Sequence, residues 1–153
     1  MEYSNVIRYI GGNQTSERKA FFEQVLARLP GYEICQFPNP MDALREIEDS
    51  EHVITLPILV ESDLNPNSFR DLENKKGSPV HTREVAGYTI NRLRTSLLAC
   101  LTPIAVVFDN PPYAEETAYL GRAGATHTIC VNLPKAVPFF VNFVREQISK
   151  PKV

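Results

Sequence analysis

The sequence predicts an α/β domain in which five parallel strands form a sheet with helices on both faces. Short apolar runs alternate with amphipathic segments five times along the chain, and this alternation requires right-handed crossovers between parallel strands. The run from Pro57 to Val60 contains no polar residue, as expected for a strand that is buried on both faces. At 153 residues the chain fits one domain, which we place at 1–150.

The elements before this strand have recognisable boundaries. A β-rich run at 5–10 ends at two glycines, and apolar residues then recur at helical spacing from about 15 to 29, after which Pro30 and Gly31 end the helix. A second strand is predicted at 32–37. Asn39 and Pro40 are typical of the cap and first position of another helix.

The elements after it are separated from it by a long polar segment. Residues 65 to about 83 lack periodicity and predict an extended surface loop. The remaining predicted elements are, in order, a helix over about 85–98, a strand over 103–108, a helix from 110 to about 122, a strand over 126–131 and a helix over 137–148.

Composition and charge exclude several classes of protein. The net charge of −2 gives no general attraction to nucleic acid or to anionic membranes. No stretch approaches the roughly 18 apolar residues of a membrane span, and the N-terminus lacks a basic region followed by an apolar one, so we expect a cytoplasmic protein. The cysteines show no metal-binding spacing and are expected to be reduced core residues: Cys35, Cys100 and Cys130.

The order and spacing of three segments resemble the receiver domain of bacterial response regulators. The segments are Ser62-Asp63-Leu64-Asn65-Pro66 after the third strand, Thr102-Pro103-Ile104 at the start of the fourth, and Ala123-Gly124-Ala125 before the fifth. The resemblance covers nearly the whole chain apart from the segment at 65–83. It implies a flavodoxin-like (CheY-like) three-layer α/β/α sandwich with strand order 2-1-3-4-5.

The residues that carry chemistry in that family are mostly replaced. In receivers an aspartate at the end of strand three accepts a phosphoryl group beside bound Mg²⁺, and this position falls on Asp63. The metal-binding acidic pair falls on Gly11 and Gly12, and the strand-four hydroxyl falls on Phe108. The strand-five aromatic residue falls on Thr128, and the lysine falls on Leu133. The resemblance is therefore to a degenerate receiver, or pseudo-receiver.

These replacements have physical consequences. Phosphoryl transfer depends on a metal and cationic groups that neutralise the transferring oxygens, and glycines offer Mg²⁺ only their carbonyls. We therefore expect Asp63 to be a poor acceptor. In the family's switch a hydroxyl on strand four and an aromatic ring on strand five move together. Here the aromatic residue, Phe108, is on strand four and the hydroxyl residue, Thr128, is on strand five, so we expect a fixed conformation.

Three carboxylates are candidates for an acidic crevice at the carboxyl end of the sheet, where open α/β sheets bind ligands. Glu61 faces the same side as Asp63, and we expect it to pair with Arg8; a built-in phosphate mimic is the alternative. Asp63 either accepts bonds from loop amides or contacts a metal or ligand. Asp109 either supplies a metal oxygen or begins the next helix.

No nucleophile elbow, phosphate-binding loop or metalloprotease motif occurs, so we expect no enzyme and no cofactor. The first hypothesis is a phosphorylation-independent protein-interaction module that contacts a signalling protein, or forms a homodimer, through 113–148. Its aromatic residues are Tyr113, Tyr119, Phe139, Phe140 and Phe143. One alternative keeps phosphorylation of Asp63 with an atypical Mg²⁺ site that uses Glu61 or Asp109. The other is binding of a small anion or nucleotide at the Gly11-Gly12-Asn13 loop.

Overall fold

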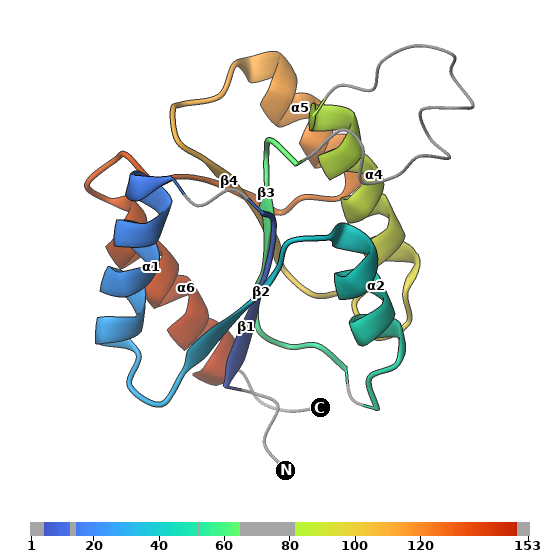
Figure 1. Cartoon of the computed structure of the whole chain (residues 1–153), viewed down its shortest axis with the longest axis horizontal. Coiled ribbons are helices and arrows are strands. Elements are labelled where there is room, and N and C mark those ends of the chain that lie inside the picture. Colours follow the sequence, from blue (N-terminus) through green and yellow to red (C-terminus); the bar gives the residue numbers. More distant parts are fainter. Residues whose placement is uncertain (1–4, 13–14, 52, 65–81, 150–153) are drawn as a thin grey trace.

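A computed structural model describes residues 5–12, 15–51, 53–64 and 82–149 (Figure 1). Its centre is a five-stranded sheet in the order β2-β1-β3-β4-β5, and all neighbouring strands run parallel. The strands are β1 (Val6–Ile10), β2 (Glu33–Phe37), β3 (Ile58–Glu61), β4 (Ile104–Phe108) and β5 (His127–Cys130). The predicted fold class and strand order are confirmed.

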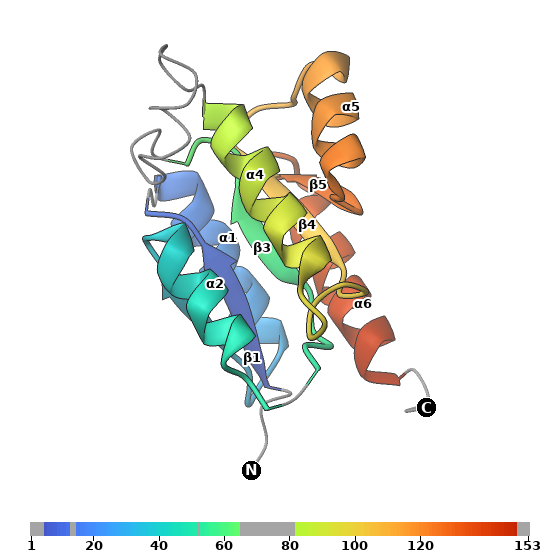
Figure 2. The same cartoon turned by 90° about the vertical axis from the view of Figure 1, so that its right-hand side faces the viewer.

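Helices cover both faces of this sheet, which gives three layers (Figures 1 and 2). The helices are α1 (Ser16–Arg28), α2 (Pro40–Glu48), α4 (Thr82–Thr95), α5 (Ala114–Ala123) and α6 (Ala136–Ser149). The first and last pack over one face, and the other three pack over the opposite face. Each face therefore has its own apolar core, and β3 contributes side chains to both.

The two central strands are the most deeply buried part of the molecule. All residues of β3 and β4 are buried, and every residue of β3 has an exposed fraction of 0%. The last of these residues is Glu61, whose carboxylate therefore lies in the interior. Burial of a carboxylate is costly unless it is ion-paired and hydrogen-bonded, so this residue constrains what surrounds it.

Side-chain caps begin α1 and α2 at the residues that the sequence indicates. The Thr15 hydroxyl accepts a hydrogen bond from the Arg18 amide (3.2 Å), and the Asn39 side chain accepts one from the Met41 amide (2.9 Å). Pro40 occupies the first turn of α2. The cap on α1 fixes the start of that helix beside the carboxyl end of the sheet, with Arg18 in its first turn.

Several local expectations differ from the structure. The cysteines are free, but none is fully buried as predicted, since Cys100 and Cys130 are half-buried and Cys35 is exposed. Cys35 is exposed because β2 is an edge strand whose alternate residues face solvent. Helix α5 begins at Ala114 and not near 110, since a residue that precedes a proline avoids the helical conformation and Pro111 and Pro112 stand in sequence here. The predicted loop at 65–83 lies outside the described residues up to 81, and α4 begins at Thr82.

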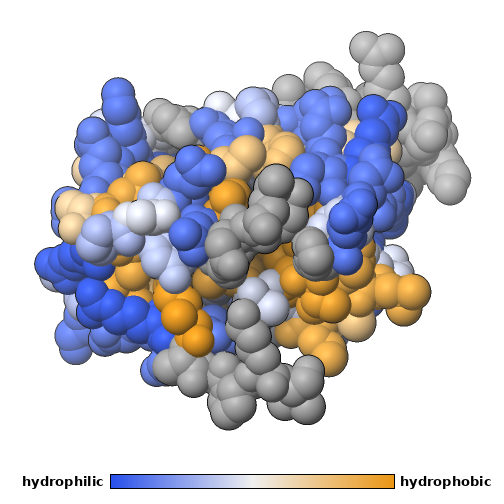
Figure 3. Space-filling view, turned by 90° about the horizontal axis from the view of Figure 1, so that it is seen from below, coloured by the Kyte–Doolittle hydropathy of each residue, from blue (hydrophilic) through white to orange (hydrophobic). Residues whose placement is uncertain are grey.

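Hydrophobic residues reach the surface at the end of the molecule where the strands begin (Figure 3). Leu97 and Leu101 follow α4 and are 89% and 91% exposed, and Val53 precedes β3 and is 62% exposed. Across the residues that the structure describes, no helix combines the length and apolar character needed to cross a membrane.

The neighbouring residues Phe139 and Phe140 of α6 provide a matched test of the core. Phe140 has an exposed fraction of 0% and packs on Phe21 with 5.9 Å between ring centroids, whereas Phe139 is 44% exposed. We expect Phe140→Ala to lower the free energy of unfolding by about 3–5 kcal/mol. Phe139→Ala should lower it by less than about 1 kcal/mol. Urea denaturation measures both, and equal losses would contradict the packing described.

Candidate functional site

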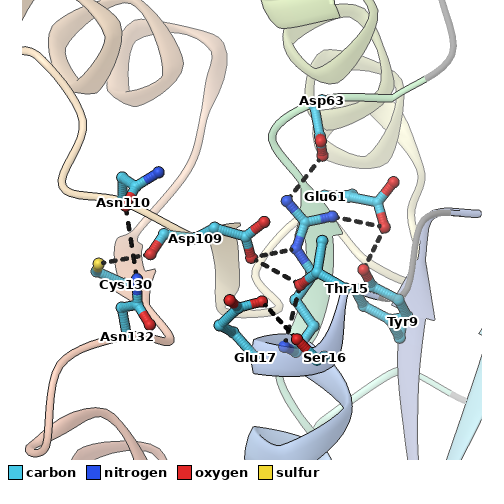
Figure 4. A network of polar contacts seen from close by, with 11 residues as sticks. Tyr9, Thr15, Ser16, Glu17, Glu61, Asp63, Asp109, Asn110, Cys130 and Asn132 are labelled. Atoms are coloured by element: carbon cyan, nitrogen blue, oxygen red, sulfur yellow. Dashed lines mark hydrogen bonds and ion pairs between the residues drawn. The ribbon is translucent and has the colours of Figure 1, made fainter.

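Three carboxylates converge on one buried guanidinium group at the carboxyl end of the sheet (Figure 4). The group belongs to Arg18, whose side chain is 2% exposed. Its Nη1 lies 3.1 Å from Glu61 Oε2, its Nη2 lies 2.9 Å from Asp63 Oδ1, and its Nε lies 2.9 Å from Asp109 Oδ1. The three nitrogens thus each hold a different acid, from β3, from the turn after it and from the residue after β4.

The beginning of α1 positions the Arg18 side chain. Thr15 accepts a hydrogen bond from the Arg18 amide, and its hydroxyl also donates to Asp109 Oδ1 at 3.1 Å. Asp109 therefore receives bonds from both the helix cap and the guanidinium, which donates through Nε. Because the same oxygen holds both groups, the start of the helix and the end of β4 are fixed to each other.

Glu61 is the innermost of the three acids. Its side chain is 1% exposed, and its Oε2 accepts a hydrogen bond from the Tyr9 hydroxyl as well as the ion pair from Arg18. Burial raises the pKa of Tyr9, and the adjacent Glu61 carboxylate raises it further. The phenol therefore stays protonated and donates. The carboxylate is stabilised by one ionic and one neutral donor, as a buried acid requires.

Gly11, which follows β1, lies against the same carboxylate. A Cβ atom at this position would lie 2.6 Å from the Glu61 Cβ, so a side chain does not fit unless the strands shift. The Gly11 carbonyl is also engaged, since it accepts a hydrogen bond from Gln36 Nε2 at 2.9 Å. The acidic residue that the receiver pattern has here and the buried Glu61 are therefore mutually exclusive.

The site carries more negative than positive charge, because one guanidinium faces three carboxylates. Burial disfavours the charged form of Arg18, but attraction led by Asp63 outweighs it and raises the pKa of the guanidinium. Asp63 and Asp109 remain partly open to water, with side chains 46% and 25% exposed. Among the described residues, no cluster of three or more acids, histidines or cysteines is arranged to hold a metal ion.

The predicted pair between Arg8 and Glu61 is wrong. Arg8 Nε lies 2.5 Å from Glu46 Oε1 on α2. The reason is the alternation of side chains along β1, which points Tyr9 toward the α1 side of the sheet and Arg8 toward the α2 side. Glu61 faces the α1 side, so its partner comes from that helix.

The sequence interpretation missed Arg18, because a charged residue in the first turn of an amphipathic helix is normally solvated. One signal was present. Arg18 stands four residues before Phe22 and seven before Val25, so it continues the buried stripe of α1. A cation on an apolar stripe, facing a strand that ends in acids, indicates a buried ion pair.

The other residues at receiver positions lie apart from the three acids. Phe108 is 6% exposed and belongs to the core under α2, α4 and α5, while Thr128 is half-buried on β5. Leu133, in the turn before α6, is 51% exposed. Gly12 is exposed, and a Cβ there would meet Pro38 only at ordinary contact distance.

The aromatic residues between 113 and 148 divide into core and surface. Phe140 and Phe143 are buried, at 0% and 8% exposure, and Tyr119 is half-buried. Tyr113 is 80% exposed and Phe139 44%. Only the last two offer large aromatic surfaces to a partner.

Removal of the guanidinium should leave Glu61 as an uncompensated buried charge. We expect Arg18→Met to lower the free energy of unfolding by about 3–5 kcal/mol, and Arg18→Met with Glu61→Gln to recover more than about 1 kcal/mol of it. The control is Arg8→Met, whose partner Glu46 is 39% exposed and stays hydrated. If Arg18→Met costs no more than Arg8→Met in urea denaturation, Arg18 is not the main counter-charge of the site.

Tyr9 should give the protein a stability limit at alkaline pH. Its pKa is raised in the folded state, so its contribution is complete below the unfolded value of about 10 and is lost as the pH rises above that value. Tyr9→Phe should be less stable at about pH 8, because Glu61 loses a donor, and the difference from wild type should shrink by up to about 1.4 kcal/mol per pH unit above about pH 10. Urea denaturation between these conditions measures it. The control is Tyr113→Phe, at a tyrosine that is 80% exposed, which should change the free energy of unfolding at about pH 8 by less than about 0.5 kcal/mol.

No protein-family model matches the sequence, and no curated protein matches it. Several solved structures match the fold of the chain. A signal receiver domain of a histidine kinase from Clostridium thermocellum is 12% identical, with a TM-score of 0.64, and the match covers 95% of this chain and 98% of that one. Another match is the receiver domain of a sensor histidine kinase from Pseudomonas aeruginosa, whose structure has magnesium coordinated in the active-site cleft. It is 16% identical, with a TM-score of 0.62, and the match covers 95% of this chain and 98% of that one.

A third match is an atypical orphan response regulator for which a phosphorylation-independent regulatory mechanism is described. It is 12% identical, with a TM-score of 0.58, and the match covers 94% of each chain. At such identities the likeness concerns the arrangement of the backbone, and receiver domains with this arrangement are signalling modules. The chain has the fold of a response-regulator receiver domain.

Proposed function

We propose that this chain is a pseudo-receiver that acts as a phosphorylation-independent protein-interaction module in bacterial signal transduction. The observation that carries the proposal is the ion-paired Arg18, which engages all three acids of the crevice. In this role the chain is not an enzyme, and its receiver scaffold serves to present a surface.

The candidate acceptors are poorly placed for phosphoryl transfer. An acceptor needs a carboxylate oxygen that can reach the donor and cations that neutralise the transferring group. Glu61 is the last residue of β3 but is sealed in the interior, and Asp63, two residues later, is more exposed but already paired with Arg18. Leu133 stands at the lysine position, so it adds no positive charge. Whichever acid corresponds to the family's acceptor, the same guanidinium holds it.

The charge of the crevice also argues against anionic ligands. A phosphoryl donor or a nucleotide would approach two partly exposed carboxylates, Asp63 and Asp109, and the guanidinium that joins them among the described residues is buried and already ion-paired. The negative charge of such a ligand would be repelled by these carboxylates, and the repulsion would grow as water is excluded from the crevice. This favours protein binding over the two alternatives of phosphorylation and nucleotide binding.

A fixed conformation follows from the same contacts. Arg18 joins α1 to the carboxyl ends of β3 and β4, and Cys130 Sγ lies 3.5 Å from the Asp109 carbonyl, which extends the network to β5. In receivers an aromatic ring moves inward when the switch operates, whereas here the Phe108 ring already belongs to the core. We therefore infer that the surface between 113 and 148, with Tyr113 and Phe139 exposed, is constitutively ready for a partner.

The test adds Mg²⁺ with acetyl phosphate, and separately Mg²⁺ with beryllofluoride, to ¹⁵N-labelled protein. We expect no saturable change in the amide spectrum and no phosphoryl mass adduct, because Arg18 already pairs with each of the three acids of the crevice. The magnesium-binding receiver domain from P. aeruginosa, treated in parallel, serves as the positive control. A saturable change in the wild type that Asp63→Asn or Glu61→Gln abolishes would overturn the proposal in favour of a working phosphorylation switch.

A further inference from the structure

We propose that the free edge of β5 is a docking site for an extended, acidic segment of a partner protein. This inference rests on the proposed function, since it names the chemistry of the partner that the module would bind. The relevant region consists of β5, the turn after it and the first turn of α6, and we refer to these residues, 126–139, as the β5 edge.

The strand itself has an unpaired side. Among the described strands, β5 is the last in the sheet order and lies beside β4 (Figure 2). It pairs with β4 from His127 opposite Ala105 to Cys130 opposite Phe108. No other described strand pairs with it. The backbone groups on the outer side of such a strand can bond an added strand, which is one of the recurring ways in which proteins bind extended peptides.

A cavity of about 220 Å³ lies along this side. It contacts three successive residues of the strand, Thr128 to Cys130, and also Leu133, Lys135 and Phe139. Side chains of successive strand residues point to opposite faces of a sheet, so a cavity that reaches all three lies at the border of the strand and not over one face. A segment added to β5 could therefore place a side chain in the cavity.

The residues around the cavity suit an apolar side chain. Leu133 and Phe139 are 51% and 44% exposed, and both line it. Proteins usually protect edge strands with charges or prolines. The opposite edge strand, β2, follows this rule, because it exposes Glu33 and is followed by Pro38. The segment from Thr126 to Val131 contains neither a charged residue nor a proline.

Charge distinguishes an acidic partner from a second copy of this chain. The β5 edge, residues 126–139, contains Lys135 but no aspartate or glutamate, although the whole chain has a net charge of −2. Lys135 also lines the cavity. A second copy would bring a second Lys135 to the interface with no acid from the same edge beside it, whereas a segment with acidic flanks would neutralise the lysine.

The experiment selects a random peptide library on the immobilised full-length chain and uses the most enriched peptide as the probe. We expect enriched peptides in which apolar residues alternate and acids flank them. In an amide spectrum the probe should perturb signals of 126–139, and N-methylation of alternate residues of the probe should abolish binding because it removes the backbone donors. Lys135→Glu should weaken the affinity by at least about two- to fivefold, and Leu133→Glu should weaken it more.

Leu97→Glu is the matched control, since it places the same charge on an exposed leucine at the other end of the molecule and should bind the probe as the wild type does. The inference is overturned if no peptide is enriched, if the N-methylated probe binds equally well, or if Leu133→Glu has no effect. It is also overturned if the chain dimerises and Leu133→Glu makes it monomeric, because a second copy then occupies the edge. None of these outcomes bears on the response to acetyl phosphate, so the proposed function is judged separately.

Discussion

The buried guanidinium of Arg18 is the interaction on which this end of the molecule depends. A carboxylate sealed behind β3 is tolerable only with a compensating charge, and Arg18 supplies it while also holding Asp63 and Asp109. The beginning of α1 and the ends of β3 and β4 are thereby joined through one side chain. The positive charge at this end is part of the chain itself, because it belongs to a side chain of α1.

This arrangement separates the molecule into regions of different character. The carboxyl end of the sheet is acidic and internally paired. The β5 edge is apolar with one lysine, and the opposite end of the molecule, where the strands begin, exposes Leu97 and Leu101. Arg18 already pairs with the three acids of the crevice, which is why the partner surface that we propose lies at the side of the molecule and not at this end.

The fold could be read from the sequence more fully than the site. Alternating apolar runs and local caps such as Thr15 and Asn39 act over a few residues, so they set the elements and their order. The ion pairs depend on which face of the sheet each side chain takes, and Arg8 was assigned to Glu61 because adjacency of two strands does not reveal that face. Arg18 was missed because its partners are contributed by segments 43 to 91 residues away in sequence, as Glu61 and Asp109 show.

The close contact between Gly11 and Glu61 makes three positions of the chain depend on one another. An aspartate at position 11 would collide with the Glu61 side chain. A shorter or neutral residue at position 61 would leave Arg18 with less counter-charge, and loss of Arg18 would leave a buried acid without its counter-charge. A change at any one of these three positions alone therefore destabilises the protein. The glycine, the buried acid and the arginine are compatible only as a set, so a variant that introduces an acid at position 11 must change the other two positions as well.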